Sequence, residues 1–341
     1  MGIQDIIDTN SIQDFINQST PEVIQALGDT TIKDLVIKII LNPTEAGSLF
    51  SNFINLGIHA IQSNFHIMVT GLVMVLALSL LDSLAPEESS ASIAKPLILL
   101  AITLPALIIA RSLAVQAISS AAGIAGAGIP LIATLQALSG SLVLSGWTIA
   151  VVGAIPWLTW AFANVLIPVI IFNTVLKLTG QFADMQGVGK ATRHVDKGIK
   201  YVQKGAFVVS VGILGLAVKS LVLPNKLISG TVMNLLGAIP VVGNIIQGGA
   251  STLLNVAEVA LTGTGIAMIA IVILSTALPA ISMLANTAML HISNFLGSII
   301  SGDSKSTTVE ALAEGSGQLL SATLTCISMI IAAIIAFTIA R

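Results

Sequence analysis

The sequence contains very little charge. Only 9% of its 341 residues are charged, whereas an ordinary soluble domain carries about 25%. Hydrophobic residues make up 55% of the chain, and the mean hydropathy is +0.98. A soluble chain this apolar could not cover its own surface with polar groups, so lipid must be the solvent for much of it. These values give no support to a soluble enzyme.

Cysteine and aromatic residues are also scarce. The single cysteine, Cys326, lies in an apolar run and excludes an intrachain disulfide. Aromatic residues make up 4%, so the apolar mass comes from Ala, Leu, Ile and Val. The 29 glycines and many alanines and serines suit closely packed membrane helices, because small side chains let backbones approach. The net charge of −2 does not indicate nucleic-acid binding.

Motifs for catalysis or metal binding are missing. The four histidines form no metal-ligand spacing with cysteine or acidic residues. The Gly187–Lys190 segment is not a phosphate-binding loop, because Asp184 and Ala191 occupy positions that need Gly and Ser or Thr. We therefore predict a non-enzymatic protein with no catalytic residues, no cofactor and no metal.

Long apolar runs predict an all-α, polytopic transmembrane helix bundle. A spanning helix needs about 20 mostly apolar residues, and residues 67–341 hold about six or seven such runs. The expected spans are 67–84, 97–117, a long stretch at 142–178, 206–223, 265–290 and 318–340, with 227–249 as a further candidate. Residues 1–66 are predicted to form a separate acidic segment with amphipathic helices.

Proline and glycine interrupt two of these runs. Pro156 and Pro168 divide 142–178, which predicts a kinked span or two half-helices. Pro240 and Gly243 interrupt 227–249, which either crosses the membrane or re-enters it. Broken helices persist in a membrane only where protein or a cavity satisfies the freed backbone groups. The candidate pore, gate or hinge residues are therefore Pro156, Asn164, Pro168, Pro240, Gly243 and Glu258.

Glu258 joins that set because it is a lone acid in an apolar helical pattern, and charge is costly in lipid. Small residues provide a different signal. Ser119, Gly123 and Ala127 fall four residues apart and predict a face for helix contact.

The distribution of charge predicts orientation. Residues 177–204 carry six basic and two acidic residues and are predicted to form a cytoplasmic loop. Its basic residues Arg193, Lys197, Lys200 and Lys204 share one helical face, which either contacts anionic headgroups or acts as a topological anchor. Counting back through three spans places the acidic residues 1–66 outside. The charge asymmetry favours a crossing at 227–249, which puts the acidic loop 302–317 outside and Arg341 inside. A re-entrant segment reverses both.

Two apolar motifs resemble a known family. Residues 238–243 (Ala-Ile-Pro-Val-Val-Gly) and 164–172 (Asn-Val-Leu-Ile-Pro-Val-Ile-Ile-Phe) resemble the stage III sporulation protein AE family of endospore-forming bacteria. The order of spans from about residue 67 to 341, including the helix with Pro279, is also similar. The chain departs from the family in showing no signal sequence and in lacking an acidic, Thr-rich stretch after Gly243.

The resemblance implies a membrane subunit of the secretion-like channel complex between mother cell and forespore, located in the mother-cell membrane around the forespore. The implied partners are the lipid bilayer, other channel subunits, a separate cytoplasmic ATPase and further copies of the chain. Two alternatives stay open, namely a stand-alone secondary transporter, because interrupted helices occur in both halves, and a purely structural scaffold.

Overall fold

The computed structural model describes residues 91–138, 154–182, 186–220, 253–300 and 307–339, together with helical positions 58, 62, 69 and 73. Every residue in these ranges is helical and none is in a strand, which confirms the all-α prediction. The predicted N-terminal segment, apart from two of those positions, and the segment 227–249 with Pro240 and Gly243 lie outside the described residues.

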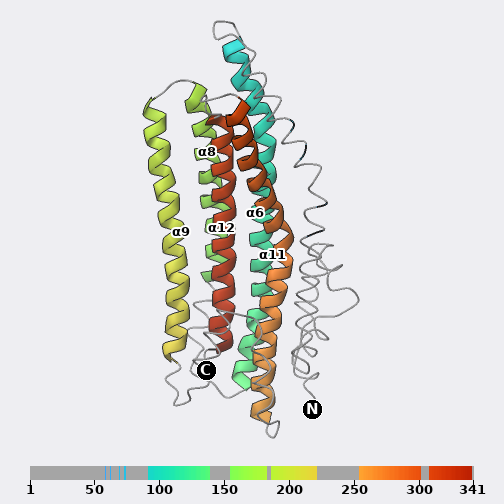
Figure 1. Ribbon diagram of the computed structural model, residues 1–341. Helices are drawn as coiled ribbons and strands as arrows, with labels where there is room; N and C mark the ends of the chain where they lie inside the picture. Colours follow the sequence, from blue (N-terminus) through green and yellow to red (C-terminus); the bar gives the residue numbers. More distant parts are fainter. Residues whose placement is uncertain are drawn as a thin grey trace.

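Long helices run side by side to form an elongated bundle (Figure 1). They are α6 (Ala91–Leu138), the π-helical turn η3 (Phe162–Leu166), α8 (Ile167–Phe182), α9 (Gln186–Ser220), α11 (Leu253–Ile300) and α12 (Thr307–Ile339). Within the described part, four helical segments are long and apolar enough to cross a membrane: Leu104–Pro130, Ala154–Gly180, Thr264–Leu296 and Val309–Ala336. The predicted span at 206–223 begins in α9, and its end lies outside the described ranges.

A stripe of alanines on α6 forms part of the main core with α11 and α12. The buried alanines are Ala110, Ala114, Ala117, Ala121 and Ala125, which recur every three or four residues and so share one helical face. The predicted small-residue face falls beside this stripe. Ser119 is exposed, whereas Gly123 and Ala127 are only partly buried. The buried alanines make most of the contact with the core, and Ala127 of the predicted face also packs against it.

Two glycines show how closely these helices approach. A Cβ atom on Gly128 of α6 would collide with the side chain of Met268 on α11. A Cβ atom on Gly265 of α11 would collide with Thr338 of α12. The neighbouring side chain already fills the space at both sites, so an added methyl group would force Met268 or Thr338 to move.

Proline does not break the helices that the structure describes. Residues 154–182 are helical throughout, so the chain forms one helix here rather than two half-helices. Pro156 lies near the start of the described part of this helix, and the residues before Ala154 lie outside the described ranges. Pro279 likewise lies inside the continuous α11.

The irregularity around Pro168 is local. The π-helical turn η3 ends at Leu166, two residues before Pro168, and the N–H of Ile167 bonds the carbonyl of Phe162, five residues earlier. Pro168 has no N–H and its ring crowds the preceding turn, so a widened turn accommodates it without ending the helix. The side-chain amide of Asn164 donates to the Trp160 carbonyl at 3.1 Å and provides a further local bond.

The helices alternate in direction along the bundle. The end of α8, the beginning of α9, the end of α11 and the beginning of α12 lie at one end, and Ser220 and Leu253 lie at the other (Figure 1). The connections 183–185 and 301–306 therefore join helices at the same end. The segment 227–249 lies outside the described residues, so both the crossing and the re-entrant alternatives stay predictions.

Candidate functional site at the polar seam

Helix α9 lies at the edge of the bundle and has two different faces (Figure 1). Thr192, Ile199 and Gln203 are buried against the bundle, and Asp196 is half-buried among them. The basic residues Arg193, Lys197, Lys200 and Lys204 are all exposed. The predicted cytoplasmic loop at 177–204 is thus largely helical, with only residues 183–185 between α8 and α9.

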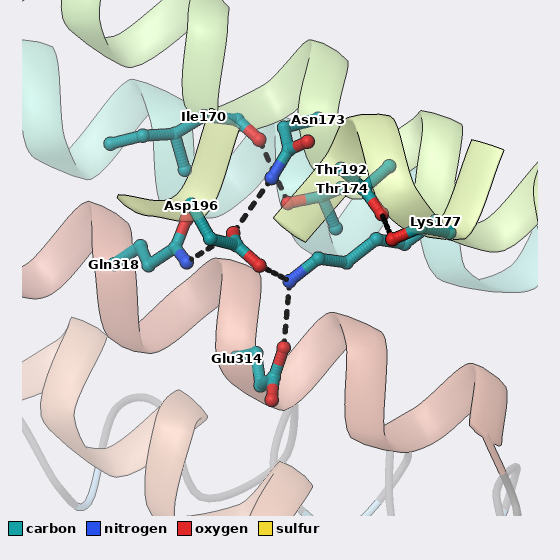
Figure 2. A network of polar contacts seen from close by, with 9 residues as sticks. Ile170, Asn173, Thr174, Lys177, Thr192, Asp196, Glu314 and Gln318 are labelled. Carbon is teal, nitrogen blue, oxygen red and sulfur yellow. Dashed lines mark hydrogen bonds and ion pairs between the residues drawn. The ribbon is translucent and has the colours of Figure 1, made fainter. Parts of the chain in front are cut away.

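Asp196 is the centre of a polar network between three helices (Figure 2). Its Oδ2 accepts from Lys177 Nζ of α8 at 2.7 Å. Its Oδ1 accepts from Asn173 Nδ2 of α8 at 2.7 Å and from Gln318 Nε2 of α12 at 2.8 Å. One carboxylate therefore links α9 to both α8 and α12, and its charge is balanced by three donors.

Lys177 extends this network to a second carboxylate. Its Nζ also lies 2.7 Å from Glu314 Oε2 of α12. The side chains of Lys177 and Asp196 are 14% and 18% exposed, whereas that of Glu314 is 50% exposed. When all three are ionised, two acids face one base, and solvent screens the outer acid far more than the inner one.

The contact continues along α9 through Gln203. Its side-chain amide donates to the carbonyl of Gln318 at 3.2 Å, and its Oε1 accepts from Ser321 Oγ at 3.2 Å. We refer to the seven residues Asn173, Lys177, Asp196, Gln203, Glu314, Gln318 and Ser321 as the polar seam. Asn173 Oδ1 is buried and has no hydrogen-bond partner among the residues that the structure describes.

Glycines bring the helices of the seam close together. A Cβ atom on Gly315 of α12 would collide with the side chain of Thr174 on α8. A Cβ atom on Gly180 of α8 would lie 2.6 Å from Cγ1 of Val188 on α9. Because both positions are glycine, the helices lie close enough for Lys177 of α8 to contact Asp196 of α9 and Glu314 of α12.

The sequence-predicted pore or hinge residues do not gather at this seam. Pro156 and Asn164 are exposed and Pro168 is partly buried, all on the helix that continues into α8. Glu258 lies within α11, and its side chain is outside the described part of the chain, as are Pro240 and Gly243. The four predicted basic residues lie along the exposed side of α9, adjacent to the seam.

Sequence reasoning missed the acceptors and donors of the seam. It treated Lys177, Asp196 and Glu314 only as loop charges that set topology. A usable signal was present, because Asn173 and Lys177 are four residues apart and so are Glu314 and Gln318. The chemistry of the seam is pairing between helices. In the described part of the chain, no three His, Cys, Asp or Glu side chains come together to hold a metal ion.

Comparison with known protein families gives one match. Residues 30–340 match the family described as stage III sporulation protein AE. No curated protein matches the chain, and no solved structure does.

Proposed function

Because the chain belongs to the stage III sporulation protein AE family, we propose that it is a non-enzymatic subunit of the channel complex that links mother cell and forespore. The family is one of sporulation membrane proteins and not a known enzyme family. The four candidate spans identify an integral membrane protein. The finer role, which is to form or gate the membrane path, is the proposal.

The polar seam is the observation that carries this role. Helices α6, α11 and α12 meet mainly through apolar and small side chains, but the first half of α9 meets its neighbours through the contacts of Asp196 and Gln203. Hydrogen bonds and ion pairs have specific partners, so a change in the pairing of Asp196 would change the position of α9 without altering the apolar core. Helix α9 is therefore the element that can shift and open a path while the core stays closed.

The same arrangement suits the proposed partners. The basic side of α9 begins at the end of the bundle that the positive-inside rule assigns to the cytoplasm. A cytoplasmic ATPase and other channel subunits would act on this end, in the mother-cell membrane around the forespore. Several copies of the chain would surround one path.

The proposal is tested by removing the gene from a spore-forming host that carries it. We expect development to stop at the stage that the family name specifies, with full rescue by the intact chain and loss of rescue by Asp196→Ala. His194→Ala is the matched control, because His194 is exposed on the same helix and its one hydrogen bond among the described residues is to the carbonyl of Lys190. Normal spore yield without the gene would contradict the proposed function.

A stand-alone secondary transporter is the second candidate. The Lys177–Asp196 pair favours it, because ionisable pairs within membrane helices mark ion and proton pathways in transporters. Vesicles that contain only the purified chain separate the two functions. Uptake of a solute coupled to an ion gradient would favour the transporter, whereas ring-shaped particles with a central opening, seen by electron microscopy, would favour the channel.

A further inference from the structure

The exposed basic residues of α9 extend deep along the membrane-spanning helices. Arg193, Lys197, Lys200 and Lys204 are spaced four, three and four residues apart and form a single stripe, which we call the basic stripe. At a rise of about 1.5 Å per residue, the basic stripe is roughly 16 Å long. Its depth in the membrane decides what it can contact.

Two tryptophans locate the membrane on α8 and the turns before it. Trp157 and Trp160 are 68% and 57% exposed, near the start of the candidate span Ala154–Gly180. Exposed tryptophan favours the interface between lipid and water. A hydrocarbon core of about 30 Å corresponds to about 20 helical residues, so the opposite interface lies near Lys177 to Gly180.

The contacts of the polar seam give the membrane depth of α9 relative to α8. Asp196 bonds Asn173 and Lys177, so it lies at or just below the second interface. Lys204 lies eight residues further along α9, which is about 12 Å deeper. The contact of the neighbouring Gln203 with Ser321 agrees, because Ser321 lies well inside the span Val309–Ala336 of α12. The stripe therefore runs from the interface to near the midplane.

Lipid is a poor environment for this stripe. Cations at this depth are costly in hydrocarbon unless they are paired or reach water. Among the described side chains, none forms an ion pair with Lys197, Lys200 or Lys204. By contrast, the exposed side chains at comparable depth are Val165 of η3 and Val169 and Phe172 of α8, which suit lipid.

We propose that the basic stripe lines an aqueous path for small anions through the membrane. This inference rests on the proposed membrane role and adds the lining element and the class of solute. Rows of Lys and Arg select anions and phosphate groups in pores, because they replace part of the hydration of the anion and repel cations. The seam holds the stripe in place, since Asp196 and Gln203 fix the opposite side of the same helical turns.

Cysteine accessibility tests the path in membranes from sporulating cells that produce the full chain with its partners. The background is Cys326→Ala, since Cys326 is fully buried. Lys204→Cys is the deep probe on the stripe, and Val169→Cys is the lipid-facing control at comparable depth on α8. We expect membrane-impermeant thiol reagents to modify Lys204→Cys and to leave Val169→Cys unmodified.

Tyr201→Cys tests the choice of ion, because Tyr201 is 73% exposed beside the stripe and its replacement keeps all four cations. We expect an anionic methanethiosulfonate to react with it roughly tenfold faster than a cationic one, since a charged cleft concentrates ions of opposite sign. The additional double substitution Lys197→Glu with Lys200→Glu leaves two cations and two anions on the stripe and should abolish the difference between the two rates.

Three results would overturn the inference. Modification of Arg193→Cys without Lys204→Cys would mean that the stripe only contacts headgroups at the interface. Protection of both would mean that lipid or another protein covers it. Equal rates for the two reagents at Tyr201→Cys would exclude anion selection. None of these readouts uses spore yield, so a failed path and a failed sporulation role remain distinguishable.

Discussion

Helix α12 has two interfaces of opposite character. Toward α6 and α11 it buries apolar residues such as Leu319, Ala322 and Ile330 in the main core. Toward α8 and α9 it presents Glu314, Gln318 and Ser321 to the polar seam. The same helix thus meets one set of neighbours through shape and the other through charge and hydrogen bonds.

Polar groups are present in both interfaces, but they behave differently. In the main core, the Thr276 hydroxyl donates to the Val272 carbonyl at 2.7 Å and that of Thr323 to Leu319 at 2.8 Å, each within its own helix. In the seam, the side chains bond across helices. Because these hydroxyls bond carbonyls of their own helix, the contacts between the core helices depend mainly on packing. In the seam, by contrast, the position of α9 depends on specific hydrogen-bond and ion-pair partners on α8 and α12.

Among these substitutions, Asp196→Ala should destabilise the folded protein most. It changes the polar seam and leaves the main core intact. It leaves Lys177, Asn173 and Gln318 without their shared acceptor, and breaking such a buried network costs about 3 kcal/mol. Thermal unfolding of the purified protein in mild detergent measures this loss, and proteolysis shows whether α9 is released first. Asp196→Asn retains an acceptor and should lose less. Equal losses for the two variants would show that the charge of Asp196, rather than the geometry of its acceptor oxygen, holds the seam.

Glycine substitutions compare packing at the two interfaces. Gly315→Ala pushes a methyl group against Thr174, whose branched side chain is stiff, and should cost about 2 kcal/mol. Gly128→Ala meets the flexible end of Met268 and should cost about 1 kcal/mol. Gly126→Ala is the control, because nothing lies near its added Cβ, and it should not destabilise the protein. Destabilisation by Gly126→Ala equal to that of the other two would contradict the packing argument.

A lipid environment and an all-α fold could be predicted from the sequence, because composition and the length of apolar runs do not depend on tertiary contacts. It did not reveal the seam, because Lys177 and Glu314 are 137 positions apart and only folding makes them neighbours. The local effect of Pro168 could not be predicted for a similar reason. Pro168 follows a π-helical turn that accommodates it, and a sequence pattern does not show whether such a turn forms.

The hydroxyl pair Thr287–Ser316 tests whether any side-chain bond between helices matters in the main core. Its two oxygens lie 2.8 Å apart between α11 and α12, and Thr287 also donates to the Met283 carbonyl at 2.8 Å. A double-mutant cycle with Thr287→Val and Ser316→Ala should give a coupling of about 0.6 kcal/mol. A coupling as large as the loss in Asp196→Ala would erase the contrast between the interfaces.

Glu314→Gln should have the smallest effect, although Glu314 makes as short a contact with Lys177 as Asp196 does. Its side chain is half exposed, so water and salt screen the pair. We expect the free energy of unfolding to fall by about 0.3 kcal/mol, and we expect this loss to decrease as salt is added. Unfolding in detergent at low and high salt measures it. A loss near that of Asp196→Ala, with no salt dependence, would mean that Glu314 is shielded from water. The part of the polar seam that excludes water would then include Glu314. Helix α9 would be held in place by the Lys177–Glu314 pair as well as by the contacts of Asp196 and Gln203.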